Sequence, residues 1–131
     1  MMIAKILIID DEVKALALLK TNLEDANFEV HTANNGVEGV IRAIQIIPDL
    51  IILDVRMPEL DGWDVCKRLK STASTKDIPI VFLTAFSSDK DREKAKTLGA
   101  AEYLTKPIDP EKLLNILRDI LLAKITEQSS S

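Results

Sequence analysis

Residues 50–58 read Leu-Ile-Ile-Leu-Asp-Val-Arg-Met-Pro, and this stretch is the most informative in the chain. Four aliphatic residues in a row, apolar at odd and even positions alike, are typical of a strand covered on both faces. Asp54 follows this run directly. A buried strand has little structural use for a carboxylate unless a partner group compensates its charge. The stretch therefore predicts a buried strand whose end carries a functional carboxylate.

Other segments repeat the strand pattern. Ile6–Ile9 and Ile80–Leu83 are apolar at odd and even positions alike, and Tyr103–Leu104 is a weaker version of the same run. Phe28–Ala33 instead alternates between larger apolar or β-branched residues and polar ones. That alternation is typical of a half-exposed strand at the edge of a sheet.

Helical segments separate these strands. Asn35 followed by Glu38 resembles a capping box, and Asp109 before Pro110 is a strong helix start. The five helices are expected through Leu16, Leu19 and Leu23, from Asn35 to Pro48, over Trp63–Leu69, from Ser88 to Gly99, and from Asp109 to about Lys124. Five strand–helix units in one chain predict an α/β fold, a parallel sheet with helices on both faces.

Composition limits the classes of protein that this chain can represent. It has 131 residues, 47% of them hydrophobic and 29% charged, which suits one globular domain. The 21 acidic residues exceed the 17 basic ones, which argues against direct binding to nucleic acid. No apolar run exceeds five residues, so a membrane span is not expected, and a single cysteine excludes an internal disulfide. These features predict a cytoplasmic protein.

The expected strand ends carry the chemistry. Asp10 and Asp11 follow the first strand, Asp54 follows the third, Thr84 ends the fourth, and Lys106 follows the fifth. Ligands of open parallel sheets bind at the carboxyl ends of the strands, so these side chains should converge. Carboxylates that converge repel one another and suit a hard divalent cation such as Mg²⁺ or Mn²⁺. The lysine and the hydroxyl would suit an added phosphoryl group.

These residues resemble the response-regulator receiver domain of two-component signalling, and the chemotaxis regulators in particular. The resemblance extends from Lys5 to about Lys124, and five motifs in the right order make it specific. The motifs are Asp10-Asp11-Glu12, Leu53-Asp54-Val55-Arg56-Met57-Pro58, Asp61-Gly62, Thr84-Ala85 and Lys106-Pro107.

The resemblance implies a flavodoxin-like fold with strand order 2-1-3-4-5, and it implies a phosphoacceptor function. Asp54 would accept a phosphoryl group. Asp11 would bind the metal ion directly and Asp10 through water. Asp54 itself and the backbone carbonyl of Arg56 would complete the protein's metal ligands. The domain would catalyse only its own phosphorylation and dephosphorylation, and it would not be an enzyme acting on a separate substrate.

The remaining implied roles concern switching and hydrolysis. Thr84 and Lys106 would bind the phosphoryl oxygens, and Tyr103 would turn inward as Thr84 moves toward the phosphoryl group. That change would alter the surface formed by the fourth helix, the fifth strand and the fifth helix. Arg56 and Phe86 would modulate access of water to the acyl phosphate. The peptide bond before Pro107 is expected to be cis.

The resemblance also implies the partners and the domain organisation. A sensor histidine kinase or a histidine phosphotransfer protein would donate the phosphoryl group. The output would pass to a separate protein or to an output domain of the same regulator, with the domain a monomer or a phosphorylation-dependent dimer. Residues 1–125 would form the receiver domain, and residues 126–131 a polar tail or the start of a linker.

Two other classes share parts of this pattern. A phosphatase of the haloacid-dehalogenase type would need a second aspartate two residues after Asp54, where this chain has Arg56. A flavin- or nucleotide-binding domain would need a glycine- or hydroxyl-rich loop after the first strand. Asp10-Asp11-Glu12 in that position would repel phosphate. Turnover of a phosphate ester or flavin colour would distinguish these alternatives.

Overall fold

The computed structural model describes residues 3–129, and strands alternate with helices throughout that range. Their order is the one that the sequence predicts. The elements are β1 (Lys5–Ile9), α1 (Val13–Asp25), β2 (Glu29–Ala33), α2 (Gly36–Ile46), β3 (Leu50–Leu53), α3 (Gly62–Lys70), β4 (Ile80–Thr84), α4 (Asp89–Thr97), β5 (Glu102–Thr105) and α5 (Pro110–Ser129).

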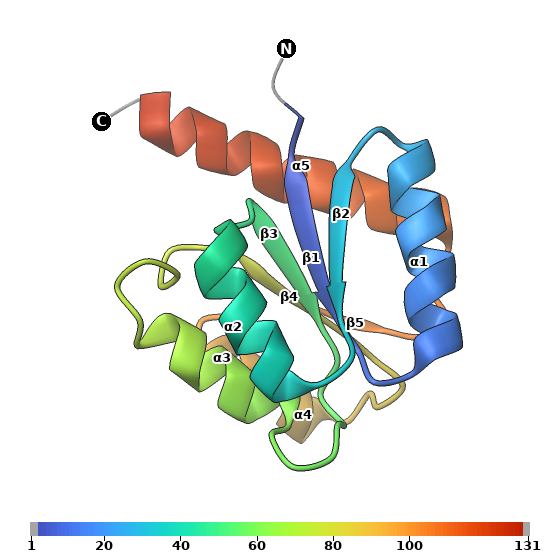
Figure 1. The fold of residues 1–131 in the computed structure, drawn as a ribbon, viewed down its shortest axis with the longest axis vertical. Helices are drawn as coiled ribbons and strands as arrows, with labels where there is room; N and C mark the ends of the chain where they lie inside the picture. Colours follow the sequence, from blue (N-terminus) through green and yellow to red (C-terminus); the bar gives the residue numbers. More distant parts are fainter. Residues whose placement is uncertain (1–2, 130–131) are drawn as a thin grey trace.

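The strands form one sheet in the order β2-β1-β3-β4-β5, and each pairing is parallel. Helices α1 and α5 cover one face of this sheet, and α2, α3 and α4 cover the other (Figure 1). The predicted α/β fold and the 2-1-3-4-5 strand order of the flavodoxin-like class are therefore confirmed.

Two layers of core lie on the two faces of the sheet. In β1, Leu7 and Ile9 pack toward α2 and α3, whereas Ile6 and Ile8 pack toward α1 and α5. All four side chains are almost completely buried. Successive residues of a strand point to opposite faces, so a strand covered on both sides must be apolar at both parities. This is the physical reason for the aliphatic runs.

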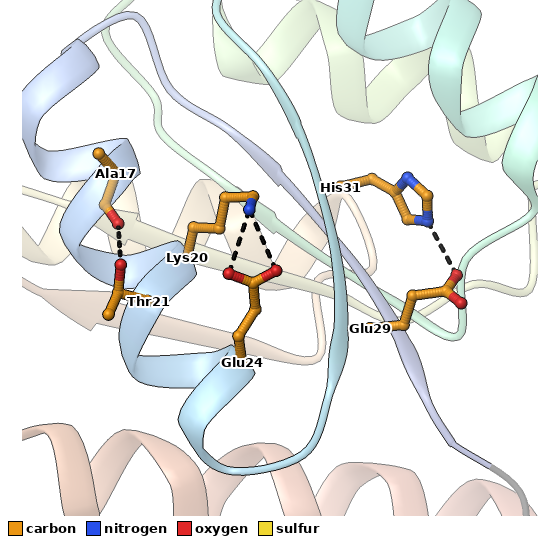
Figure 2. A network of polar contacts seen from close by, with 6 residues as sticks. All are labelled: Ala17, Lys20, Thr21, Glu24, Glu29 and His31. Atoms are coloured by element: carbon orange, nitrogen blue, oxygen red, sulfur yellow. Dashed lines mark hydrogen bonds and ion pairs between the residues drawn. The ribbon is translucent and has the colours of Figure 1, made fainter.

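Strand β2 is the edge strand that the alternating pattern predicts. On α1 beside it, Lys20 forms an i,i+4 ion pair with Glu24 at 3.0 Å, and His31 of β2 forms a 2.9 Å contact with Glu29 (Figure 2). The hydrogen bond from His31 is the main reason why the pKa of Glu29 lies below its usual value. Both contacts are solvent-accessible and contribute little to stability.

Side-chain caps begin α2, α3 and α4, and Asp109 accepts a hydrogen bond from the Glu111 N–H at 3.2 Å in the first turn of α5. Asn35 accepts a hydrogen bond from the Glu38 backbone N–H at 2.8 Å, Asp61 accepts one from Asp64 at 2.9 Å, and Ser88 accepts one at the start of α4. Each cap satisfies a backbone donor that the first helical turn leaves unpaired.

Helix α5 is longer than the sequence predicted. The expected end was near Lys124, but the helix continues to Ser129, so the predicted polar tail is helical over much of its length. Residues 125–129 contain no glycine or proline that would end a helix. The Thr126 hydroxyl also donates to the Leu122 carbonyl at 3.0 Å. Ser130 and Ser131 lie outside the described residues.

Across residues 3–129, each helix is too short or too polar to cross a bilayer.

Candidate functional site

The carboxylates predicted from the strand ends come together in the structure. One oxygen from each of Asp10, Asp11 and Asp54 lies within 4.8 Å of the others. The Asp10 backbone N–H donates to the Ala33 carbonyl at 3.1 Å, and the Asp54 N–H donates to the Ile9 carbonyl at 3.0 Å. The sheet ladder therefore continues past β1 and β3 and fixes the backbone of two of the three acids.

Lys106 joins this cluster from the end of β5, the edge strand beyond β4. Its Nζ lies 2.7 Å from Asp10 Oδ2 and 3.8 Å from Asp54 Oδ2. Its backbone N–H donates to the Thr84 carbonyl at 2.7 Å, and the Lys106–Pro107 peptide bond is cis, as predicted. The ammonium is therefore placed between two carboxylates that lie 44 positions apart in the chain.

The electrostatics of the cluster follow from this packing. Burial raises the pKa of Asp54, and the nearby charge of Asp10 raises it further. Lys106 and a hydrogen bond from the Thr84 side chain act in the opposite direction without cancelling the rise. Burial lowers the pKa of Lys106, but the hydrogen bond to Asp10 and the surrounding acids raise it overall. The cluster thus holds more negative charge than one lysine neutralises.

This donor set fits a divalent cation. The described residues offer carboxylate oxygens within one small volume, and Mg²⁺ and Mn²⁺ prefer such hard oxygen ligands. The raised pKa of Asp54 shows that its negative charge is poorly compensated by protein groups alone. An added cation would relieve that deficit.

Gly62 allows α3 to start directly against the strand that carries Asp54. Its N–H donates to the Val55 carbonyl at 2.8 Å. A Cβ atom at this position would lie 2.2 Å from the Asp54 carbonyl oxygen and 2.8 Å from the Val55 Cα. Only glycine permits this approach, which explains why a glycine follows Asp61, shortly after the segment that carries Asp54.

The two predicted modulating residues contact each other at the rim of the cluster. The Arg56 guanidinium lies over the Phe86 ring, 4.2 Å from its centroid. Both side chains are solvent-exposed. Arg56 and Phe86 each follow a site residue by two positions, in the segments just after the neighbouring strands β3 and β4, and this shared offset was the available signal for their pairing. The position where a haloacid-dehalogenase-type phosphatase needs its second aspartate is thus occupied by a stacked cation.

Thr84 and Tyr103, the predicted switch pair, both face inward. Thr84 is completely buried, and Tyr103 is 6% exposed. The Tyr103 hydroxyl donates to the Phe86 carbonyl at 2.7 Å. The Tyr103 ring stacks with Trp63 at a centroid distance of 6.5 Å and an interplanar angle of 11°, and it also lies 6.2 Å from the Phe82 ring.

Sequence reasoning missed Arg92. Its guanidinium donates to the Tyr103 carbonyl at 3.3 Å and to the Thr105 hydroxyl at 3.0 Å, and it lies 5.2 Å from the centroid of the Tyr103 ring. In the sequence this arginine is one of seven charged residues on α4, and nothing in the charge pattern distinguishes it from its neighbours.

Comparison with protein-family models matches residues 6–118 to the response regulator receiver domain. One similar curated protein is the DNA-binding dual master transcriptional regulator RpaA of Synechocystis sp., which is 43% identical over 117 residues, covering 89% of this chain and 48% of RpaA. Response regulator PleD of Caulobacter vibrioides is 39% identical over 124 residues, covering 95% of this chain and 27% of PleD.

The chain thus spans about half the length of RpaA and about a quarter of PleD. Among solved structures, chemotaxis protein CheY4 of Vibrio cholerae has a TM-score of 0.85 at 35% identity, over 90% of this chain and 98% of that structure. The fold, the acidic cluster and the family match lead to one conclusion: the chain belongs to the response regulator receiver domain family.

Proposed function

We propose that Asp54 is the phosphoacceptor and that Asp10, Asp11, Asp54 and the backbone carbonyl of Arg56 hold Mg²⁺ or Mn²⁺ beside it. The observation that carries the proposal is the convergence of three carboxylates within 4.8 Å, with the Lys106 ammonium between Asp10 and Asp54. The phosphoryl group would come from a phosphohistidine on a sensor histidine kinase or a histidine phosphotransfer protein.

The transfer is one displacement at phosphorus. An Asp54 carboxylate oxygen attacks, a P–O bond forms, the P–N bond to the donor histidine breaks, and the imidazole leaves with the electron pair of that bond. The bound ion would neutralise charge on the equatorial oxygens. Lys106 supplies the same kind of stabilisation from the protein, as an ammonium aimed at the developing negative charge.

Charge balance determines which oxygen atoms the Lys106 ammonium contacts. Asp10, Asp11 and Asp54 carry three negative charges against the single positive charge of Lys106. A divalent ion would bring the cluster to about neutral, and an added phosphoryl group would then restore a negative charge. We expect Lys106 to exchange its 2.7 Å contact with Asp10 for the phosphoryl oxygens.

The output would follow from Thr84 and Tyr103. The buried Thr84 side chain helps to lower the pKa of Asp54, which supports a position close enough to bind a phosphoryl oxygen there. The inward Tyr103 lies between the site and α4, next to the α4–β5–α5 surface on which a partner would dock. That partner would be a separate cytoplasmic protein, a second receiver domain or an output domain. The greater length of the curated relatives supports the last of these.

Acetyl phosphate, Mg²⁺ and intact mass spectrometry test the proposal. The parent protein should gain one phosphoryl group, and it should gain none after chelation of the metal. Asp54→Asn should gain none. Asp49→Asn is a matched control, because Asp49 lies at the amino end of β3, away from the acidic cluster, and its side chain accepts a hydrogen bond from the Lys5 N–H. Phosphorylation of Asp54→Asn, or its loss in Asp49→Asn alone, would refute the assignment.

A further inference from the structure

We propose that Arg92 is a positioning residue that holds Tyr103 inward and thereby couples α4 to the phosphorylation site. This inference rests on the proposed function of Asp54. It concerns a side chain outside the acidic cluster, with a geometry that no other cation of α4 shares among the described residues.

The Arg92 guanidinium makes three contacts with β5. Nη1 donates to the Tyr103 carbonyl at 3.3 Å, Nη2 donates to the Thr105 hydroxyl at 3.0 Å, and Cζ lies 5.2 Å from the Tyr103 ring centroid. The planar fork of arginine can make two hydrogen bonds and face a ring at once, and a lysine cannot. Arg92 therefore fixes both the backbone and the ring of Tyr103.

These contacts are important because α4 has little apolar attachment. Ala95 is its one fully buried side chain in the described structure, and Leu98, just after the helix, is only partly buried. The other attachment comes from cations on aromatic rings: Arg92 on Tyr103, and Lys94 on Trp63 at 4.9 Å. A helix held by so few contacts responds strongly to the loss of one of them.

Hydrogen bonds connect Tyr103 to Thr84, which lies beside the phosphorylation site. The Tyr103 hydroxyl donates to the Phe86 carbonyl at 2.7 Å, and the Phe86 N–H lies 3.5 Å from the Thr84 hydroxyl oxygen. Thr84 ends β4 next to the segment that follows β3 and carries Asp54, and its side chain opposes the rise in the pKa of Asp54. Arg92 thus favours the arrangement in which the Thr84 hydroxyl stays near Asp54. Because coupling between two sites is reciprocal, a phosphoryl group on Asp54 should tighten the Arg92 contacts in return.

Trp63 provides a direct optical report of this arrangement. It is the only tryptophan in the chain, and its ring stacks with that of Tyr103. A change in the position of the Tyr103 ring must change the surroundings of the indole. Tryptophan fluorescence therefore reports, without phosphorylation, on how Tyr103 and α4 pack around the indole.

The test compares three substitutions on α4. Arg92→Met removes the charge and the donors but keeps the stem, and Arg92→Lys keeps the charge but loses the fork. Lys90→Met is the control, because Lys90 is an exposed lysine on the same helix. Arg92→Met should slow phosphorylation by acetyl phosphate roughly fivefold or more and shift the Trp63 emission. Arg92→Lys should lie between Arg92→Met and the parent, and Lys90→Met should match the parent.

A Tyr103→Phe background separates positioning from a general loss of structure. This variant keeps the ring under Arg92 but removes the hydroxyl that donates to Phe86. Arg92→Met should still shift the Trp63 emission in this background, but it should no longer slow phosphorylation. An equal slowing in both backgrounds, or a parent-like rate and emission for Arg92→Met, would overturn the inference. If the parent itself is not phosphorylated on Asp54, the proposed function fails instead.

Discussion

Substitution of Gly62 by alanine separates two physical effects that act in opposite directions. Alanine is the better helix former, and on propensity alone the change would stabilise α3 by up to about 1 kcal/mol. The added Cβ, however, would lie 2.2 Å from the Asp54 carbonyl oxygen and 2.8 Å from the Val55 Cα. Both are backbone atoms of the segment that leaves β3, so no side chain can rotate to relieve the overlap.

The size of the effect follows from these terms. Overpacking of this kind costs about 1–3 kcal/mol after relaxation. Moving α3 away also weakens the 2.8 Å hydrogen bond from the Gly62 N–H to the Val55 carbonyl, which adds about 1 kcal/mol. After subtraction of the propensity gain, we expect Gly62→Ala to lower the free energy of unfolding by about 1–3 kcal/mol. For a domain of this size that corresponds to a fall in Tm of about 3–10 °C.

Urea denaturation and phosphorylation by acetyl phosphate together test this reasoning. Gly62→Ala should be phosphorylated more slowly than the parent, because the displaced atom is the carbonyl oxygen of Asp54 itself. Gly99→Ala is the control: Gly99 has φ +85° and a Cβ there would meet only the Lys70 side chain, at 3.9 Å, so alanine costs backbone strain without overlap, before β5 begins. It should be less stable but phosphorylated normally. A Gly62→Ala protein as stable as the parent would refute the steric argument.

Three further outcomes follow from the site. Because the pKa of Asp54 is raised in the folded protein, its charge costs stability at neutral pH. Without divalent ions, Asp54→Asn should therefore raise the Tm at pH 7. Thermal scans should show this gain shrinking as the pH falls through the raised pKa of Asp54 and absent below the ordinary aspartate value of 3.8. Lys106→Met leaves Asp10 without its 2.7 Å partner and should lower the free energy of unfolding, measured by urea denaturation, by about 1–3 kcal/mol. The partial exposure of Lys106 reduces this loss. Added Mg²⁺ should restore much of the lost stability. Arg56→Ala and Phe86→Ala should each shorten the phosphoryl lifetime as much as the double substitution does, since one 4.2 Å contact is lost in every case; additive effects would contradict a joint action.

The elements and the acidic cluster could be predicted because local sequence carries their signals. Aliphatic runs on both parities marked β1, β3 and β4, and the parallel topology then required the acids after β1 and β3 to meet. The proposal of phosphoryl chemistry at Asp54 rests on the order of five motifs in the sequence. No single motif indicated it.

Contacts between distant side chains could not be predicted in the same way. The pairing of Arg56 with Phe86 and the attachment of Arg92 to Tyr103 depend on side-chain direction across neighbouring elements, which charge or hydropathy patterns do not encode. The end of α5 was placed too early for a related reason. Polar residues after Lys124 indicated a tail, but polarity alone does not end a helix that lacks a breaking residue.

The main-chain anchoring of Asp10 and Asp54 has a consequence for the range of sequences that can maintain this site. Their backbone N–H groups extend the sheet ladder by one residue, to Ala33 and Ile9, so peptide groups place the acids. Peptide groups are common to all residue types. The apolar side chains of the strands can therefore be exchanged for others of similar volume while the acids keep their spacing. Substitutions among the apolar core residues and substitutions among the site residues can therefore accumulate independently during evolution, each within its own limits.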